Sequence, residues 1–368
     1  MGCPAGININ AYVALTTAGK FEEALDVILE TVPLPGTLGR VCDHPCEGEC
    51  ALGSSREPVA ICAIKRFLAD ERRNSKQTQK AKEKPEQKLA KVAVIGSGPA
   101  GLSAARELAR KQYRPVIFEA MARAGGMLAW GIPDYRLPSD VLQEEIQDVL
   151  DEGVELRVNT RLGKDVTLRQ LREQAFEAVI LAVGAHTGTR LAVEGEQLEG
   201  VVDCIEFLRQ ANSEQRPSVG KHVTVVGGGN SAIDSARTAL RLGAMSVTIV
   251  YRRSRAEMPA IPLEIEAAEQ EGIKILYLAA PTRLTGENGR VSAMQCVRMK
   301  LGAPDDSGRR RPIMIEGSEF AIDTDMVIYA IGQKVVWPED MDLEELEQTR
   351  WGTINANATD ASTNIEGV

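Results

Sequence analysis

Short apolar runs recur along this chain, and each is followed by a glycine or a charged residue rather than by more apolar sequence. They occupy residues 92–95, 114–118, 178–183, 222–226 and 246–251. Their continuous apolar character is typical of strands buried on both faces of a parallel sheet. Stretches of helical periodicity separate several runs, so the pattern predicts the alternating strands and helices of an α/β fold.

The rest of the pattern supplies the connecting elements. We expect helices over residues 104–110, 139–150, 230–242 and 263–270, and strands over 154–158 and 325–331. Residues 273–301 alternate as strands do, with a turn at 286–289, and residues 305–311 form a polar hairpin tip or loop. Residues 124–138 are too rich in Gly and Pro for regular structure.

The first 70 residues have a helical pattern throughout. Five apolar residues between Phe21 and Leu29 recur at helical spacing, and prolines and a glycine follow and end that helix. A second helix is expected over residues 58–70. Residues 71–90 are mostly Arg, Lys, Glu and Gln, which indicates a solvated linker or an exposed helix.

Bulk composition limits the classes of function. The 368 residues are 43% hydrophobic and 26% charged, the balance of a globular protein. A net charge of −9 argues against nucleic acid or an anionic membrane as the main partner. No apolar run is long enough to span a bilayer, and no secretory signal is evident, so we expect a cytoplasmic protein.

A glycine-rich turn directly follows the first apolar run. Gly96, Gly98 and Gly101 have the spacing G-x-G-x-x-G between an expected strand and an expected helix, which is the context of a dinucleotide-binding turn. Gly98 lets the backbone approach a pyrophosphate at the helix N-terminus. Glu119 lies 21 positions after Gly98, where a ribose-binding carboxylate is expected. An ordinary glycine turn is the alternative interpretation.

The pattern repeats 131 residues after its first glycine. Gly227, Gly229 and Ala232 form the variant G-x-G-x-x-A, again between a strand and a helix. The next strand ends in Arg252 and Arg253 instead of an acid. Arginine suits the 2′-phosphate of NADP, whereas an acid would bind the 2′-hydroxyl of NAD. Two fingerprints predict two dinucleotides with different tasks, with NADPH preferred over NADH; a solvated arginine patch is the alternative.

Cysteines are concentrated near the N-terminus. Five of the seven are Cys3, Cys42, Cys46, Cys50 and Cys62. A disulfide framework would suit a small secreted domain, so this cluster indicates metal ligation in a reducing cytosol. Close cysteines in a polar loop can bind an iron–sulfur cluster or zinc, and free thiols are the alternative. The apolar neighbours of Cys62 favour a buried core thiol, and the isolated Cys204 and Cys296 are expected to be structural.

Longer motifs carry a resemblance to a known family. They are G-S-G-P-A-G-L at 96–102, G-G-M-L-A-W-G-I-P-D-Y-R-L-P at 125–138, G-G-G-N-S-A-I-D-S-A at 227–236, Y-R-R-S-R-A-E-M-P-A at 251–260 and V-I-Y-A-I-G-Q at 327–333. With the cysteine-bearing N-terminus, they resemble the small subunit of NADPH-dependent glutamate synthase. The chain is similar also to the N-terminal half of dihydropyrimidine dehydrogenase and to the flavin subunits of bifurcating transhydrogenases.

The resemblance implies a fold and a domain order. The fold is α/β, with two nested Rossmann-like dinucleotide-binding domains preceded by a small helical iron–sulfur domain. The expected domains are a partial iron–sulfur domain at 1–70, a linker at 71–90, the first part of an FAD-binding domain at 91–215, an NAD(P)H-binding domain at 216–325 and a truncated return segment of the FAD-binding domain at 326–368.

The resemblance also implies an FAD-dependent NAD(P)H oxidoreductase. Electrons would pass from NADPH through FAD and [4Fe–4S] clusters to a partner subunit or a ferredoxin-like carrier, and no side chain is expected to act as a catalytic group. The expected cofactor-binding residues are Gly96, Gly98, Pro99, Ala100, Gly101, Glu119, Ala120, Gly126, Met127, Leu128, Gly131, Ile132, Arg136, Gly184, Gly227, Gly229, Asn230, Ser231, Ala232, Arg252, Arg253 and Gly332, with Gly125 and Pro133 also shaping the flavin pocket. The expected cluster ligands are Cys3, Cys42, Cys46 and Cys50.

The sequence departs from the family pattern at both ends. In the family, further cysteines precede the Gly-Cys-Pro segment that holds Cys3, and a Gly-Asp motif follows the segment at 365–368. We therefore expect a fragment, a partial gene product, or a subunit completed by another chain. On this pattern Cys3, Cys46 and Cys50 match one cluster, and Cys42 matches the other.

Two other functions stay open from the sequence. A disulfide reductase like thioredoxin reductase would need a Cys-x2-Cys pair near the flavin, and none of the seven cysteines has that spacing. A non-catalytic docking module of an electron-transfer complex would retain the fold without the chemistry.

Overall fold

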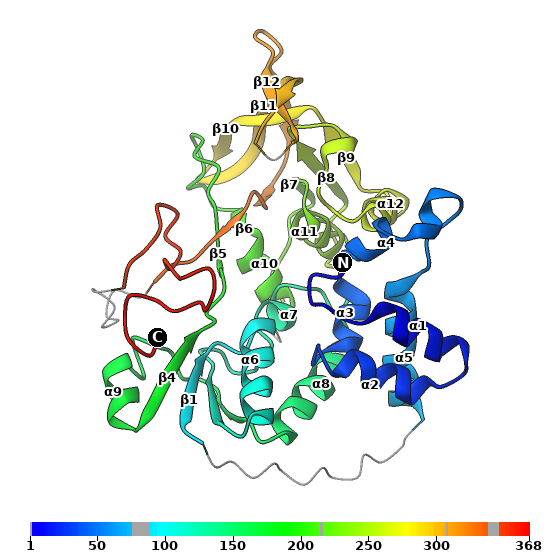
Figure 1. Cartoon of the computed structure of the whole chain (residues 1–368). Helices are drawn as coiled ribbons and strands as arrows, with labels where there is room; N and C mark the ends of the chain where they lie inside the picture. The colour runs from blue at the N-terminus through cyan, green and yellow to red at the C-terminus, as the bar shows by residue number, and fades with distance from the viewer. Residues whose placement is uncertain (1, 76–88, 214–215, 307, 338–345) are drawn as a thin grey trace. The chain divides into compact units, whose positions relative to one another are not determined.

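The computed structural model describes residues 2–75, 89–213, 216–306, 308–337 and 346–368. The chain forms two compact units, and Figure 1 labels many of their helices and strands. Unit 1 comprises Met1–Ala129, Asp134–Gly184 and Trp337–Val368, and unit 2 comprises Trp130–Pro133 and Ala185–Val336. No helix in the described residues is long and apolar enough to cross a membrane.

Unit 1 begins with a group of short helices (Figure 1). They are α1 (Ile9–Thr17), α2 (Phe21–Leu29), α3 (Pro35–Val41), α4 (Pro45–Gly48) and α5 (Ile61–Asn74), with a 3-10 turn at Ala51–Ser54. Tyr12, Ile28 and Leu68 are almost fully buried between them. Helix α2 ends before Pro33, Pro35 and Gly36, as expected. Pro35 also begins α3, because proline lacks an N–H and is preorganised for the first helical position.

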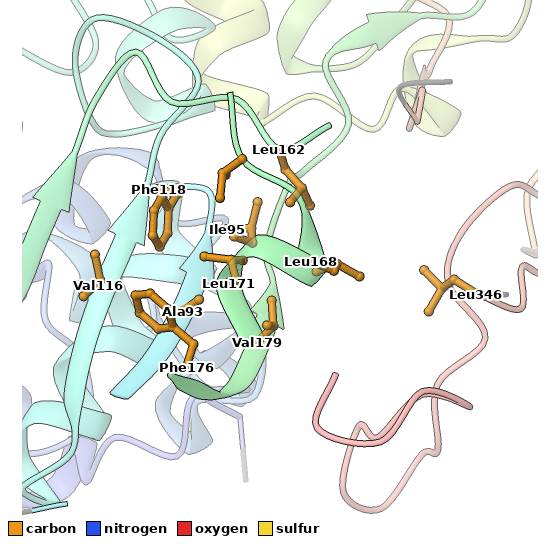
Figure 2. Packing of buried hydrophobic residues seen from close by; sticks show 11 residues of the cluster. Ala93, Ile95, Val116, Phe118, Leu162, Leu168, Leu171, Phe176, Val179 and Leu346 are labelled. Atoms are coloured by element: carbon orange, nitrogen blue, oxygen red, sulfur yellow. The ribbon is translucent and has the colours of Figure 1, made fainter. Parts of the chain in front are cut away.

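A four-stranded parallel sheet follows, in the order β3-β2-β1-β4. The strands are β1 (Lys91–Ile95), β2 (Arg114–Phe118), β3 (Glu155–Arg157) and β4 (Phe176–Leu181), and the helices are α6 (Pro99–Arg110), α8 (Ser139–Asp151) and α9 (Leu168–Glu173). The rings of Phe118 and Phe176 meet edge to face at 5.6 Å in the core between the sheet and α9 (Figure 2). Leu346 packs into the same core, so the C-terminal segment completes unit 1.

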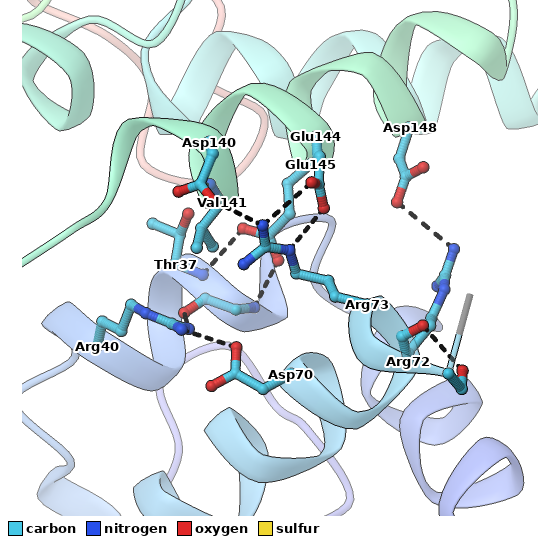
Figure 3. Close-up of polar contacts among 12 residues, drawn as sticks. Thr37, Arg40, Asp70, Arg72, Arg73, Asp140, Val141, Glu144, Glu145 and Asp148 are labelled. Atoms are coloured by element: carbon cyan, nitrogen blue, oxygen red, sulfur yellow. Dashed lines mark hydrogen bonds and ion pairs between the residues drawn. The ribbon is translucent and has the colours of Figure 1, made fainter. Parts of the chain in front are cut away.

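The N-terminal helices are fastened to α8 by polar contacts (Figure 3). The buried carboxylate of Glu145 accepts hydrogen bonds from the backbone N–H groups of Gly36 and Thr37, which lie in the first turn of α3. Arg73 of α5 bonds Glu144 at 2.6 Å and Asp140 at 2.9 Å. These bonds hold the cysteine-bearing helices against α8, within unit 1.

Unit 2 contains a five-stranded parallel sheet in the order β6-β14-β7-β8-β9. Its strands are β6 (Val201–Asp203), β7 (His222–Val226), β8 (Ser246–Tyr251), β9 (Lys274–Tyr277) and β14 (Met326–Tyr329), and its helices are α10 (Cys204–Ala211), α11 (Asn230–Arg241) and α12 (Pro262–Gln270). A 3-10 turn at Arg255–Glu257 follows β8. Hydrogen bonds from Arg241 and Arg237 of α11 hold the pKa of Glu271 at about 2 and tie α11 to the end of α12.

Antiparallel strands complete unit 2. These are β10 (Ala279–Glu287), β11 (Arg290–Pro304), β12 (Arg310–Met314) and β13 (Phe320–Asp323), with a small pair of β5 (Thr187–Gly188) and β15 (Gln333–Lys334). The predicted domain boundaries after residues 215 and 325 differ from the observed division. The reason is the pairing of β14 with β6 and β7, which places the strand expected to return to the FAD-binding domain in the sheet of unit 2.

Two further local expectations changed. Residues 124–138 include one turn of helix, α7 (Met127–Trp130), where only irregular structure was expected. Helix α5 continues to Asn74, past the predicted start of the linker, while residues 76–88 of that linker lie outside the described part of the chain.

Candidate cofactor sites

The first glycine turn has the backbone that its sequence predicts. Gly96 has φ +106°, a conformation that favours glycine, and a Cβ on it would collide with the carbonyl oxygen of Ala182 at the end of β4. A Cβ on Gly101 would collide with the carbonyl of Gly96, so only glycine allows α6 to pack this closely on β1. Both glycines are therefore required by the turn itself, with or without a ligand.

Gly98 differs, because it faces open space. A Cβ there would meet nothing closer than the Cα of Gly126, at 3.9 Å. Gly98 is the N-cap of α6, so the unpaired N–H groups of the first helical turn face the same space and favour an anion. Pro99 occupies the first helical position, and Ala100 follows it. This turn fits a pyrophosphate, which needs close backbone approach and N–H donors.

A second loop lies against the first, and its residues were only partly expected. The N–H of Gly125 donates to the carbonyl of Ser97 at 3.1 Å and to the Ser97 hydroxyl at 3.1 Å. A Cβ on Gly126 would lie 2.7 Å from the Cα of Gly98. The two loops therefore form one wall. Ser97 was not predicted as a site residue. The sequence feature that could have indicated it is its position between Gly96 and Gly98, together with the Gly125-Gly126 pair that it contacts.

Glu119 directly follows β2 and is 6% exposed. Its carboxylate accepts hydrogen bonds from the Ser97 N–H at 3.0 Å, from the Ser97 hydroxyl, and from the Met121 N–H at 2.7 Å. Two carboxylate oxygens offer about four lone pairs, so one acceptor position is left for a ribose hydroxyl. The Glu119 carboxylate thus fits a ribose and also holds the glycine turn in place. Ala120 follows Glu119 in the sequence.

The remaining expected flavin-side residues fall into both units. Met127, Leu128, Arg136 and Gly184 belong to unit 1, and Gly131, Ile132, Pro133 and Gly332 belong to unit 2. The carbonyls of Trp130 and Ile132 accept hydrogen bonds from the Asn212 side chain at 3.1 and 3.0 Å. Asn212 was not predicted, and it holds this segment within unit 2.

The second glycine turn repeats the geometry of the first in unit 2. Gly227 has φ +147°, and a Cβ on it would collide with the carbonyl of Ala330 after β14. Gly229 is the N-cap of α11, and a Cβ there would meet nothing within 4 Å. Ala232 is fully buried, and Ser231 lies between it and Asn230 in the first turn of the helix. This turn also fits a pyrophosphate.

The two arginines after β8 have different environments. Arg253 is 4% exposed, and its guanidinium donates to the carbonyl of Arg310 at 2.8 Å and to Asp305 at 2.7 Å. Arg252 is exposed, and within the described residues it forms no ion pair. Arg255 is paired with Glu269 at 2.6 Å. Arg252 is thus the arginine whose charge is available to a ligand.

The N-terminal helices enclose a pocket that four cysteines line. These are Cys3, Cys42, Cys46 and Cys62, together with Tyr12, Lys65 and apolar residues. Cys50 is not among the lining residues and was expected to be a ligand; Cys62 is among them and was expected to be a core thiol. The signal missed for Cys62 is its place on the face of α5 that also carries Ile61 and Lys65.

Electrostatics separate these cysteines. Burial raises the pKa values of the Cys46 and Cys62 thiols above their usual value. The neighbouring Lys65 ammonium opposes this rise without cancelling it. Backbone N–H groups, that of Val59 foremost, hold the pKa of the half-buried Cys50 thiol below its usual value. Over the described ranges, no three His, Cys, Asp or Glu side chains converge where one metal ion could bind. A four-iron cluster needs its thiolates spread out, one on each iron, which the pocket's walls provide.

Two family models match this chain. Residues 90–368 match the family described as pyridine nucleotide-disulphide oxidoreductase. Residues 1–77 match the family described as dihydropyrimidine dehydrogenase domain II, 4Fe–4S cluster. The matches support FAD and NAD(P)H as cofactors of the two-fingerprint region and a [4Fe–4S] cluster as cofactor of the N-terminal helices, so the cofactor predictions are confirmed.

Two curated relatives match this chain over its whole length. The chain is 44% identical to the NADP(+)-dependent formate dehydrogenase subunit beta of Moorella thermoacetica, over 100% of this chain and 55% of the relative. It is 36% identical to the glutamate synthase (NADPH) small chain of Azospirillum brasilense, over 100% and 79%. The chain therefore spans little more than half the length of the first relative and most of the second.

Solved structures share the fold. FprA of Mycobacterium tuberculosis in complex with NADPH superposes with a TM-score of 0.62 at 20% identity, over 73% of this chain and 77% of that one. The matched families and the relatives lead to one conclusion. The chain belongs to the pyridine nucleotide-disulphide oxidoreductase family and, within it, to the group of the glutamate synthase small chain.

Proposed function

We propose that this chain is the NADPH-oxidising, FAD-containing subunit of an electron-transfer enzyme. The observation that carries the proposal is the pair of glycine turns that both keep an open, N–H-lined helix terminus, at Gly98 and at Gly229. One turn lies in each unit, so the chain can hold two dinucleotides at once. When bound, NADPH supplies a hydride to FAD, and the reduced flavin can release electrons singly to an iron–sulfur cluster.

The protein's own part is binding and orientation. The N-terminus of α6 and the Ser97–Gly125 contact would hold the FAD pyrophosphate, and Glu119 would hold its ribose. The N-terminus of α11 would hold the pyrophosphate of NADPH, with Arg252 on its 2′-phosphate. These groups fix which cofactor takes which site, and none of them needs to transfer a proton.

We also propose an electron-accepting partner subunit and a reducing, cytoplasmic location. The relatives are named as subunits or chains of larger enzymes, which supports a partner. All seven cysteines are free thiols, which suits a reducing compartment. The thiol-lined pocket would be the point from which electrons leave the chain.

Cofactor analysis and steady-state kinetics test the proposal. The purified full chain should release FAD on heating and reduce ferricyanide with NADPH as donor. Flavin-containing protein that reduces ferricyanide with neither NADPH nor NADH would contradict it. Protein that binds no FAD after reconstitution would contradict the assignment of the first glycine turn.

A further inference from the structure

The cysteine pocket is built from four separate parts of the chain. Cys3 lies on the N-terminal segment, Cys42 follows α3, Cys46 lies in α4, and Cys62 lies in the first turn of α5. The N-terminal segment is held close to α4, because a Cβ on Gly2 would lie only 3.0 Å from the Cα of Cys46. Four sulfurs can therefore enter one space from different directions, as the four irons of a cubane cluster require.

The pocket also supplies positive charge. Lys65 lies one turn after Cys62 on α5 and is 6% exposed, and in the described structure no carboxylate pairs with it. A buried ammonium without a carboxylate partner is costly unless other negative charge is nearby. Thiolates in the same pocket would supply that charge, and a cluster with four thiolates carries a net negative charge that the ammonium would offset.

One sulfur already has a donor of the kind that cluster ligands use. The backbone N–H of His44 donates to the Cys42 sulfur at 3.3 Å. Hydrogen bonds to the sulfurs tune the potential of iron–sulfur clusters. The Cys62 thiol makes only long contacts to the carbonyls of Leu38 and Gly39, at 3.6 and 3.5 Å. An S–H group is a weak hydrogen-bond donor. The Cys62 thiol therefore loses little hydrogen-bond energy when it releases its proton to solvent on binding a metal.

We propose that Cys62 is the fourth thiolate of a [4Fe–4S] cluster held by Cys3, Cys42 and Cys46. Cys50 is not a ligand of this cluster, because it does not line the pocket and lies between α4 and the 3-10 turn at Ala51–Ser54. This inference rests on the proposed function only for the identity of the metal group, an iron–sulfur cluster. The choice of ligands rests on the residues that line the pocket. The pocket thus holds a complete all-cysteine ligand set.

Metal analysis of single variants tests the ligand set. The full chain and its Cys62→Ala, Cys50→Ala and Cys204→Ala variants are reconstituted anaerobically with iron and sulfide. Iron, acid-labile sulfide and the electron paramagnetic resonance of the dithionite-reduced protein are then measured. Cys204→Ala is the matched control, because Cys204 is a buried thiol in unit 2 whose pKa burial raises to about 12.

The wild type, Cys204→Ala and Cys50→Ala should each hold about four iron and four sulfide per chain in this site. Cys62→Ala should hold at most about three iron, with a changed resonance, because one iron loses its only protein ligand. Unchanged iron content and resonance in Cys62→Ala would overturn the proposal, and so would a loss confined to Cys50→Ala.

Two further measurements keep the result decisive. If Cys62→Ala loses its FAD as well, and so fails to fold, Cys62→Ser replaces it; an altered resonance supports the proposal and an unaltered one overturns it. Flavin reduction by NADPH is followed in the same samples. Its absence from every variant, the wild type included, would count against the proposed function alone, because the iron counts still decide the ligand.

Discussion

Arg252 should determine the preference for NADPH, and Arg253 should not. The structure separates two adjacent residues that the sequence treats alike, since Arg253 is 4% exposed and bound to Asp305, while Arg252 is exposed and has no ion pair in the described residues. We consider the variants Arg252→Ala and Arg253→Ala, each compared with the wild type.

The magnitude follows from the contact that is lost. A hydrogen bond to a charged group is worth about 1.5–3 kcal/mol, and exposure to water places Arg252 at the lower end. The ratio of kcat/KM for NADPH to that for NADH should therefore fall roughly tenfold in Arg252→Ala. Arg252→Lys should retain part of the preference, because an ammonium keeps the charge without the bidentate geometry.

Arg253→Ala should act on stability instead. Removing the guanidinium takes one hydrogen bond from Asp305 and one from the carbonyl of Arg310, which should lower the free energy of unfolding by about 1–3 kcal/mol. Kinetics with both nucleotides and urea denaturation are the assays. An unchanged nucleotide ratio in Arg252→Ala, with a reduced ratio in Arg253→Ala, would refute the reasoning.

Three other predictions follow from the contacts. Gly98→Val should reduce FAD content while Gly229→Val retains FAD and raises the KM for NADPH, because each Cβ enters a different open turn; equal FAD loss in both would count against two separate sites. Glu271→Gln should destabilise the protein by about 1–2 kcal/mol at pH 7 in urea denaturation. Because the pKa of Glu271 is lowered in the folded protein, this contribution is complete above about pH 4.5 and is lost as the pH falls through about 2. A difference in unfolding free energy between the wild type and Glu271→Gln that persists at about pH 2 would contradict this prediction. Lys65→Met should lower the cluster's reduction potential in a redox titration, whereas the exposed Arg66→Met should not, because only Lys65 lines the pocket.

The sequence predicted the parts of the fold that depend on local pattern. Strand β2 at 114–118 and strand β8 at 246–251 have the predicted bounds, because buried parallel strands are continuous apolar runs with clear ends. The glycines at 96 and 227 adopt the positive φ that their turns need. These features are encoded within a few neighbouring residues.

The features that the sequence did not reveal depend on distant contacts. The assignment of residues 326–329 to unit 2 depends on pairing with β7, about a hundred residues away. The burial of Arg253 depends on Asp305 at the end of hairpin β11–β12, and the exposure of Cys62 to the pocket depends on which face α5 turns inward. Pattern alone does not show which side chain of a helix or turn will face a ligand.

Reduction of the bound flavin by NADPH tests the central claim most directly. The FAD-loaded full chain is mixed with NADPH without oxygen, and the flavin absorbance is followed in a stopped-flow spectrophotometer. We predict rapid bleaching that slows when the transferred hydrogen at C4 of the nicotinamide is deuterium, since hydride transfer breaks that bond. Flavin that dithionite bleaches but NADPH and NADH do not would contradict the account.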